Sequence, residues 1–314
     1  MSFFRWPQLW AIFITFLSLH PTLALDCEPE LRQKICKGNS TYCTGEDHDF
    51  EDLVVEIAKE ASPLVQKLFC DVTGIRIVRP KRDPYAGEYT RYSEIITVRS
   101  DFQDPITSEN ESPINDTFGY GYSTIIQANG RPFPRDEGSM RKFELTLLLV
   151  HELAHHMENV WLNKDAYRCT NPVAWPVTAK LRRAASRAAT CRLNECSVGD
   201  WRKSELAPLM EYVAVGPAPS RYALTNAQED FAEMFELYQM IEYYGYDLRL
   251  NYADGSLALD QSKNLHAEAK LNKVRLMRAL EDLPERGGRS AEKWVYDHML
   301  CQGNFDRKLL NETK

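Results

Sequence analysis

The sequence lacks an excess of basic residues. It contains 38 Lys and Arg against 45 Asp and Glu, which gives a formal net charge of −7. Proteins that bind nucleic acids commonly present clustered positive charge, so this balance argues against a nucleic-acid partner. Internal repeats and low-complexity tracts are also missing. The remaining composition, with 44% hydrophobic and 26% charged residues, is typical of a soluble globular protein that can bury a full core.

Long hydrophobic runs are absent after residue 24. Before it, Arg5 precedes an apolar run of 11 residues, Leu9–Leu19, and the small residues of Thr22–Ala24 offer a cleavage site. This layout is typical of a secretory signal peptide. A membrane span needs about 20 apolar residues, which this run does not reach. We therefore predict a signal peptide over residues 1–24 and a secreted mature protein without a membrane segment.

Cysteine usage supports the same compartment. All eight cysteines follow residue 24, and an even number in a secreted chain predicts up to four disulfides, whose pairing stays open. Four Asn-X-Ser/Thr sites are typical of a glycoprotein. The cysteines are Cys27, Cys36, Cys43, Cys70, Cys169, Cys191, Cys196 and Cys301, and the glycosylation sites are Asn39, Asn110, Asn115 and Asn311.

The periodicity of apolar residues predicts an α+β fold in a single domain over residues 25–314, with a small mixed sheet followed by a mostly helical part. Residues 25–48 are cysteine-rich and are predicted to be irregular. A helical pattern then spans Asp49–Phe69, where Pro63 can break it into two pieces. Beyond Asn171 helices are predicted to the end of the chain. The predicted strands are Ile75–Val78, Tyr92–Val98 and Tyr122–Gln127, the predicted helix before Asn171 is Ser139–Trp161, and residues 165–205 are predicted to be a helical insertion.

The helix predicted near Ser139 contains the motif His151-Glu152-Leu153-Ala154-His155. Residues four apart share one face of a helix, so both imidazoles can reach one metal ion, while Glu152 can contact a metal-bound water. Zinc lowers the pKa of such a water, and a neighbouring carboxylate accepts its proton. The alternative is a chance match on a structural helix, which predicts no bound metal. The apolar positions expected to pack on the other side are Val150, Leu153, Met157 and Val160.

Zinc needs a third protein ligand in such a site. The metzincin pattern requires a glycine and a histidine after the pair, but Glu158 and Trp161 occupy those positions. The aspartate-liganded type expects a Gly-Thr dipeptide, which does not occur in this chain. A glutamate therefore remains the expected ligand. The downstream candidates are Glu195, Glu205, Glu211, Glu229, Glu233 and Glu236.

Glu229 is the preferred candidate because it lies in the first turn of a predicted helix. That helix opens with a capping box, T-x-x-Q, at Thr225–Gln228. Glu233 lies one turn later on the same face, where it can hydrogen-bond a ligand histidine and select its tautomer. A solvated acidic face is the alternative for an isolated helix. The predicted buried stripe is Phe231, Met234, Phe235, Tyr238 and Ile241.

The segment Tyr222–Glu233, YALTNAQEDFAE, resembles the third-ligand region of anthrax-lethal-factor-type zinc peptidases, which are gluzincins. Those proteins carry a tyrosine seven residues before the ligand glutamate, a Thr-Asn pair and a Glu-x-Phe-Ala-Glu run. The resemblance covers only this segment and the His-Glu-x-x-His motif. This chain is smaller, lacks a toxin-like delivery region and places 73 residues between His155 and Glu229. No toxin target is therefore transferred.

The resemblance implies a zincin-like fold and a set of site residues. It implies Zn²⁺ bound by His151, His155 and Glu229. It further implies Glu152 as general base, Tyr222 as hydrogen-bond donor to the developing oxyanion, and Glu233 as a partner of a ligand histidine. A donor aimed at that oxygen strengthens as charge develops.

Together these patterns predict a secreted zinc metalloendopeptidase that hydrolyses protein or peptide substrates. The alternative is a catalytically inactive zincin-fold protein that binds an extracellular protein partner, although the intact Glu152 and Tyr222 speak against it.

Tyr122–Gln127 is either the sheet edge that an extended substrate pairs with or a plain strand. His156 points off the ligand face, so a packing or hydrogen-bonding role is predicted for it. The residues predicted to be only structural are His266, His298, Tyr238, Tyr243, Tyr244 and Tyr246.

Overall fold

The computed structural model describes only part of the chain, and the structural statements below concern that part. It comprises residues 25–35, 48–78, 87–99, 122–134, 136–162, 211, 213–216, 218–220, 222–224, 227–252 and 256–282. The predicted signal peptide, the four glycosylation sites, the predicted insertion over residues 165–205 and six of the eight cysteines lie outside these ranges.

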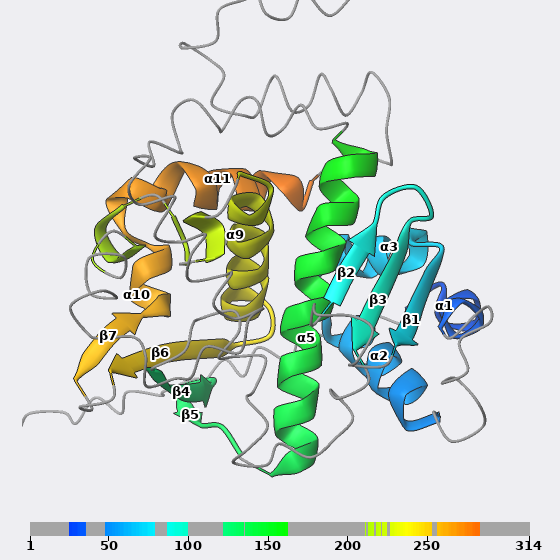
Figure 1. Cartoon of the computed structure of the whole chain (residues 1–314), viewed down its shortest axis with the longest axis horizontal. Coiled ribbons are helices and arrows are strands. Elements are labelled where there is room, and N and C mark those ends of the chain that lie inside the picture. Colours follow the sequence, from blue (N-terminus) through cyan, green and yellow to red (C-terminus); the bar gives the residue numbers. More distant parts are fainter. Residues whose placement is uncertain are drawn as a thin grey trace, which may run out of the picture.

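A long helix, α5 (Glu137–His156), stands at the centre of the fold, with an N-terminal group of elements on one side and a C-terminal group on the other (Figure 1). Its first turn is capped by Asp136, whose carboxylate accepts a hydrogen bond from the Ser139 backbone N–H at 2.9 Å. A π-helical turn, η3 (Met157–Trp161), continues it. The helix predicted over Ser139–Trp161 is thus confirmed, with a change of helix type in its last turn.

The N-terminal group contains a three-stranded sheet of β1 (Gly74–Val78), β2 (Gly87–Thr90) and β3 (Ile95–Arg99) in the order β1-β3-β2. β3 pairs parallel with β1 and antiparallel with β2, so β2 is an edge strand. The strand predicted over Tyr92–Val98 is wrong at its start, because residues 91–94 form a turn in which Tyr92 is 98% exposed. Aromatic and β-branched residues favour strands, but here a tight turn takes precedence.

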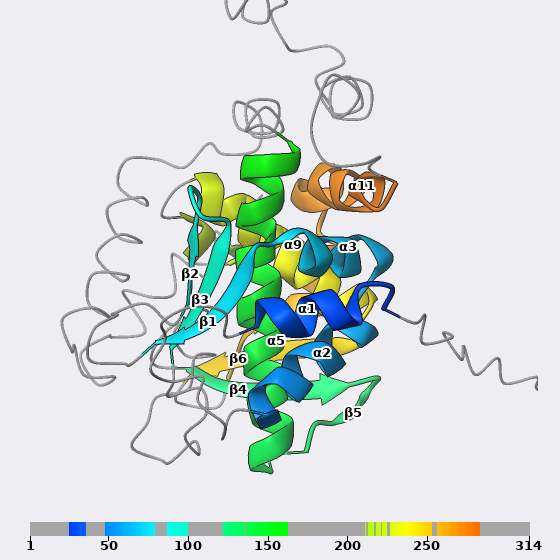
Figure 2. The ribbon, with the colours of Figure 1, turned by 90° about the vertical axis from the view of Figure 1, so that its right-hand side faces the viewer.

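Three helices accompany this sheet, α1 (Glu28–Lys34), α2 (His48–Glu60) and α3 (Pro63–Asp71) (Figure 2). The predicted break at Pro63 is confirmed, because proline is tolerated only in the first turn of a helix. Ser62 caps α3 by accepting a hydrogen bond from the Val65 N–H. The irregular segment predicted over residues 25–48 is wrong for α1, which carries acidic residues in its first turn and basic residues in its last turn, an arrangement that the helix dipole favours.

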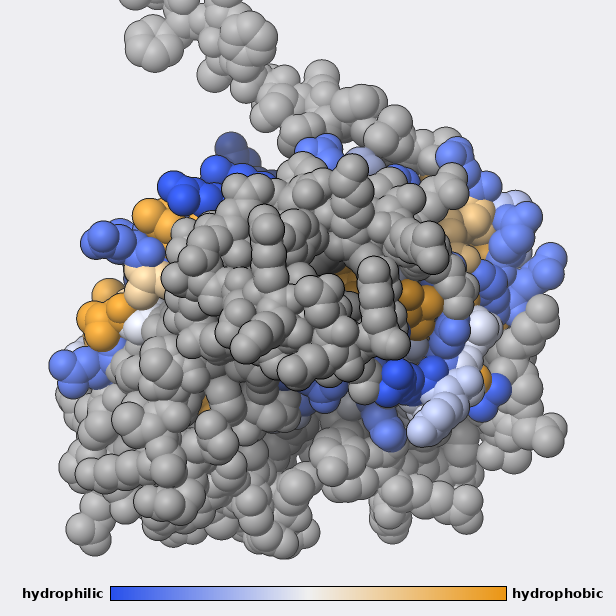
Figure 3. All heavy atoms as spheres, turned by 90° about the horizontal axis from the view of Figure 1, so that it is seen from above, coloured by the Kyte–Doolittle hydropathy of each residue, from blue (hydrophilic) through white to orange (hydrophobic). Residues whose placement is uncertain are grey.

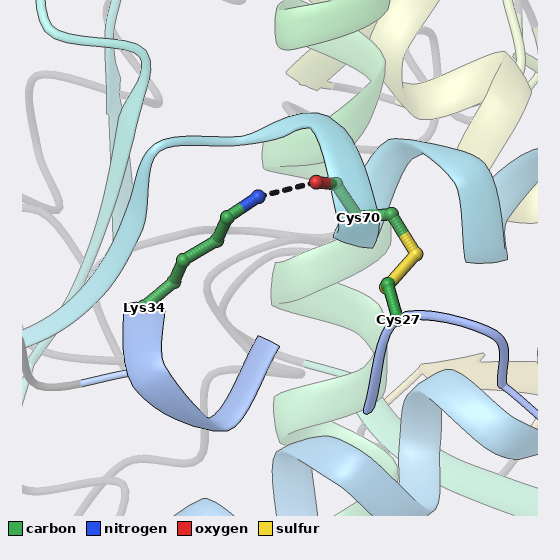
Figure 4. The surroundings of a disulfide bond; sticks show 3 residues. All are labelled: Cys27, Lys34 and Cys70. Atoms are coloured by element: carbon green, nitrogen blue, oxygen red, sulfur yellow. Dashed lines mark hydrogen bonds between the residues drawn. A yellow bond between two sulfur atoms is a disulfide. The ribbon is translucent and has the colours of Figure 1, made fainter. Parts of the chain in front are cut away.

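A disulfide joins α1 to the end of α3 (Figure 4). It links Cys27 and Cys70, whose Cα atoms are 5.8 Å apart and which are separated by 43 residues in sequence. Next to it, the Lys34 ammonium donates a hydrogen bond to the Cys70 carbonyl oxygen. One of the up to four predicted disulfides, whose pairing the sequence left open, is therefore Cys27–Cys70, and the remaining cysteines lie outside the ranges given above.

The C-terminal group contains a second, four-stranded antiparallel sheet in the order β5-β4-β6-β7. The prediction of a mainly helical chain beyond Asn171 agrees with most of the described elements there, but it missed two strands, which follow α9. Gly245, with φ of 69°, turns the chain out of α9 into β6, whose buried Tyr246 and Leu248 alternate with more exposed residues. The strands are β4 (Tyr122–Ala128), β5 (Arg131–Pro132), β6 (Tyr246–Tyr252) and β7 (Leu257–Asp260).

Helices complete the C-terminal group. The principal one, α9 (Ala227–Glu242), packs along α5 (Figure 1). The four shorter elements are η5 (Tyr222–Leu224), α10 (Gln261–Leu265), η6 (Glu268–Lys270) and α11 (Leu271–Leu280). The stripe predicted to be buried on α9 is confirmed for its first four members, and Ile241 is half-buried. α9 is in fact buried on nearly all sides, since every residue from Asp230 to Met240 is buried.

One apolar cluster extends from the N-terminal helices through α5 to α9 and α11. Its fully buried members include Leu31, Ile57, Leu68, Ile75, Ile96, Leu149, Leu153 and Phe235. On α5, Val150, Leu153 and Met157 are buried and Val160 is half-buried, as predicted. This cluster holds α5 and α9 in fixed register, which places the polar residues of both helices next to one another.

None of the helices in the described ranges has both the length and the apolar character needed to cross a membrane. The coloured residues on the face shown in Figure 3 are mainly hydrophilic, and the hydrophobic ones occur in small separate groups. Among the residues of known placement, the large hydrophobic side chains that are exposed are Tyr92, Val215, Leu257 and Leu271.

Candidate metal centre

The second half of α5 presents both histidines of the motif toward α9. The rings of His151 and His155 lie 4.9 Å apart between centroids, as expected for residues one helical turn apart. His151 is buried, with 8% of its surface exposed, and His155 is half-buried. His151 is therefore the less accessible of the two imidazoles.

The first turn of α9 brings Glu229 to the two imidazoles. Its Oε2 atom lies 3.1 Å from His151 Nε2 and 3.3 Å from His155 Nε2. The three ligand atoms all lie within 4.8 Å of one another. Atoms bound to one zinc ion at about 2.0–2.1 Å in a tetrahedron are about 3.3 Å apart. The three side chains thus fit the donor types and the spacing that a zinc ion requires.

Two further carboxylates of α9 face the other nitrogen of His151. Its Nδ1 atom lies 3.1 Å from Glu236 Oε2 and 3.3 Å from Glu233 Oε1. A donor N–H on Nδ1 hydrogen-bonded to a carboxylate leaves Nε2 free for a metal and fixes the orientation of the ring. The expected histidine partner, Glu233, is at this site. The sequence pattern predicts Glu236 only as a candidate ligand. Glu229, Glu233 and Glu236 follow one another at i, i+4 and i+7, which places all three on one helix face.

His151, Glu233 and Glu236 form a second group that could in principle hold an ion among the placed residues. This group shares His151 with the first, and it offers one imidazole and two fully buried carboxylates. The first group offers two imidazoles and one carboxylate, the donor set that zinc sites commonly use. We therefore regard Glu233 and Glu236 as residues that orient His151.

The site concentrates charge in a buried environment. Burial disfavours a charge on His151, but hydrogen bonds to Glu229, Glu233 and Glu236 outweigh it and raise its pKa well above the usual value. Burial alone would raise the pKa of Glu229, but the hydrogen bonds to both histidines hold it well below its usual range. Burial and the neighbouring Glu233 raise the pKa of Glu236 to about 8. The ionised Glu229, held between two imidazoles, is the group that makes the site attractive to a cation.

Glu152 is buried beside the histidines, with 5% of its surface exposed. Burial raises the pKa of this carboxyl group, and the charges of His151 and His155 partly offset that effect. A carboxylate with a raised pKa is better matched to proton transfer near neutral pH. The backbone N–H of Tyr89 on β2 also hydrogen-bonds it, which ties the carboxylate to the edge strand.

The edge strand β2 lies directly on α5. A Cβ atom at Gly87 would come within 2.5 Å of the Leu148 side chain, so only glycine permits this approach. Both readings of Tyr122–Gln127 stay open, because β4 pairs with β6 along one edge and with β5 only at Gln127 and Ala128 along the other. The strand edge beside Glu152 belongs to β2, which the sequence pattern missed because β2 has only four residues and begins with Gly87 and Glu88, which disfavour strands.

His156 lies on the other side of α5, as predicted, and is fully buried. Its Nε2 atom lies 2.8 Å from Asp71 Oδ2, and its Nδ1 atom lies 3.1 Å from the Tyr89 hydroxyl. Trp161 donates a further hydrogen bond to Asp71 Oδ2 at 2.7 Å. These contacts join α3 and β2 to α5, the helix that carries Glu152.

The predicted oxyanion donor, Tyr222, is also brought to the site. It lies on η5, is half-buried, and its ring centroid is 6.1 Å from that of His151.

The remaining candidate ligands are not among the described residues of the site. Glu211 is exposed and is not part of either group. Glu195 and Glu205 lie outside the described ranges, and so does Thr225 of the predicted capping box. His266 is half exposed and lies 3.7 Å from Glu242, away from the site.

No known protein family, curated protein or solved structure matches this chain.

Proposed function

We propose that this protein is a secreted zinc-dependent metalloendopeptidase of the gluzincin type. One observation carries the proposal: His151 Nε2, His155 Nε2 and Glu229 Oε2 converge from two helices, with the carboxylate oxygen 3.1 and 3.3 Å from the two nitrogens. Three ligands of these types leave one tetrahedral position for water or substrate, which distinguishes catalytic from structural zinc sites. Residues 1–24 support secretion through their signal-peptide pattern.

The residues around the ligands support hydrolysis. Zinc bound there would supply a water of lowered pKa and polarise a carbonyl group. Glu152 accepts a proton on its carboxylate from the attacking water and delivers it to the leaving amine nitrogen. Tyr222 donates a hydrogen bond toward the developing oxyanion. Glu233 and Glu236 hold the His151 ring in the orientation that points Nε2 at the ion.

The edge strand β2 offers a place where an extended substrate can bind. β2 lies on α5 beside Glu152 and pairs on one side with β3. An extended peptide could pair with the other side of such a strand by backbone hydrogen bonds. This arrangement supports a protein or peptide substrate.

The test begins with metal content and peptidase activity of the purified secreted protein. We expect about one zinc per chain, digestion of casein, loss of digestion with a chelator, and recovery when zinc is restored. Because bound metal stabilises only the folded state, chelation should also lower the unfolding temperature.

Two variants separate metal binding from catalysis. Glu152→Gln should keep zinc and lower the rate about 10²- to 10⁴-fold. Glu229→Gln should lose zinc, whereas Glu242→Gln, an exposed change on the same helix, should bind zinc like the unaltered protein. Absence of bound zinc in the unaltered protein would overturn the proposal. Bound zinc without peptidase activity would instead favour the inactive zincin-fold binder.

A further inference from the structure

Two buried lysines lie near the site and have no role in the chemistry described above. Lys270 ends η6 and is fully buried, and Lys273 in α11 is 5% exposed. Lys263, by contrast, has a side chain that is 79% exposed. Burying an ammonium group is costly unless its donors are satisfied, so the partners of these two lysines indicate what they do.

Lys270 binds the segment that leads to Tyr222. Its Nζ donates hydrogen bonds to the carbonyl oxygens of Val213 at 2.6 Å and Gly216 at 2.7 Å. The third bond goes to Asn264 Oδ1 at 2.7 Å, which satisfies all three ammonium protons. Two of these three contacts hold backbone of the segment that precedes Tyr222, so the lysine restrains the main chain there.

Asn264 extends the same restraint toward the tyrosine. Its Nδ2 donates to the carbonyl oxygen of Pro219 at 3.2 Å. The neighbouring Ser220 Oγ accepts a hydrogen bond from the Ala223 N–H at 3.0 Å, inside η5. Lys270 and Asn264 thus hold the chain at Val213, Gly216 and Pro219, immediately before the turn that carries Tyr222.

Lys273 binds the first turn of α9 instead. Its ammonium forms an ion pair and hydrogen bond with Asp230 Oδ2, and the two side chains are only 6% and 9% exposed. Asp230 directly follows Glu229 in the chain. The contact therefore ties the turn of α9 that carries the third ligand to α11.

Building on the proposed function, we propose that Lys270 and Lys273 are positioning residues with separate targets. Lys270, through the backbone carbonyls of Val213 and Gly216, sets the position of Tyr222, and Lys273, through Asp230, sets the position of Glu229. Lys270 ends η6 and Lys273 lies in the first turn of α11, so one short stretch of chain positions both an oxyanion donor and a metal ligand.

The first test compares Lys270→Met and Lys273→Met with the matched control Lys263→Met. Zinc affinity is measured by competition with a chromophoric chelator, and peptide hydrolysis is measured separately for kcat and KM. Lys273→Met should weaken zinc binding about tenfold or more, as for other residues that orient metal ligands. Lys270→Met should leave zinc affinity within about threefold and lower kcat about tenfold. Lys263→Met should change neither quantity.

Double variants distinguish positioning from general stabilisation. If Lys270 acts through Tyr222, adding Lys270→Met to Tyr222→Phe should lower kcat little further, because the interaction is already lost. Asp230→Leu/Lys273→Met removes both charges and should regain stability, yet zinc should remain weakly bound. Asn264→Ala, a milder change, should lower kcat in the same direction as Lys270→Met. If both single lysine variants lower zinc affinity and kcat alike, or if the losses in kcat multiply in the Tyr222→Phe background, the proposal is overturned.

A readout independent of activity keeps this inference separate from the proposed function. By amide hydrogen exchange, Lys270→Met should speed exchange of the Ala223 amide and leave the amides of α9 unchanged, whereas Lys273→Met should do the reverse. This holds whether or not the protein is a peptidase. If the unaltered protein binds no zinc, the proposed function fails alone. If exchange at Ala223 is unaffected by Lys270→Met, the positioning role itself fails.

Discussion

The two sides of α5 are stabilised by different kinds of contact. On the N-terminal side, apolar side chains of α1 to α3 and the three-stranded sheet are buried together, and a disulfide joins two of the helices. On the C-terminal side, charged and amide side chains are buried among the apolar ones. They include Asp230, Glu233, Glu236, Gln239, Asn264, Lys270 and Lys273.

This contrast shows how the fold can accommodate the candidate site. Apolar burial is non-directional and tolerates small shifts, whereas a buried charge is stable only when its partner is in place. The side that carries the carboxylates and the tyrosine turn therefore depends on specific pairs. The other side supplies a core that does not depend on them.

The largest effect is expected from breaking a buried ion pair on the C-terminal side of α5. Lys273→Met leaves the Asp230 carboxylate buried without its cation, and should lower the free energy of unfolding by about 3–5 kcal/mol. Urea denaturation of the metal-free protein measures it. Lys263→Met, at an exposed position, should change the value by less than about 1 kcal/mol. Unfolding of Lys273→Met at the same urea concentration as the unaltered protein would contradict the role of the pair.

The next largest effect is expected from removing the disulfide on the N-terminal side of α5. Cys27→Ser/Cys70→Ser opens a loop of 43 residues and should lower the free energy of unfolding by about 4 kcal/mol. Guanidinium denaturation should show this loss while zinc content stays unchanged, because the disulfide lies away from the ligands. A loss of zinc together with stability would show that the two sides of α5 are not independent.

A smaller effect is expected at the contact between β2 and α5. Tyr89→Phe removes the hydroxyl that lies 3.1 Å from His156 Nδ1, and should lower the free energy of unfolding by about 1 kcal/mol. Tyr92→Phe is the matched control, because Tyr92 lies in the adjoining turn and is 98% exposed. Equal stability of both variants would mean that the Tyr89 hydroxyl contributes nothing to holding β2 on α5.

The smallest effect concerns the ion pairs of Lys142 with Glu56 and Glu60 on the solvent side of α2 and α5, at 2.7 and 2.8 Å. Lys142→Met should lower the free energy of unfolding by no more than about 0.5 kcal/mol, since exposed pairs contribute little. Burial opposes the charge on Lys142, but the two glutamates prevail and raise its pKa. The contribution should therefore be complete below about pH 10 and disappear as the pH rises through the raised pKa. A stability difference that grows above pH 10 would contradict this assignment.

Local patterns in the sequence predicted much of the candidate site. The spacing of His151 and His155, the helical turn that carries Glu229, and the break at Pro63 all follow from the 3.6-residue period and from the missing N–H of proline. The same period could have identified Glu236 as a partner of His151. Strands were harder. β2 has only four residues, whereas β6 alternates apolar and polar residues over its whole length, a period-2 signal that the sequence contained and the prediction missed.

The sequence by itself determined which residues share a helix face, because that depends only on neighbours within two turns. It could not determine which faces meet. Glu229 reaches His151 across 78 residues, and Lys270 reaches Val213 across 57, through contacts that many weak apolar interactions hold in place. Those long-range contacts are decided only when the whole core packs, and so the convergence of the ligands and the partners of the buried lysines belong to the tertiary structure.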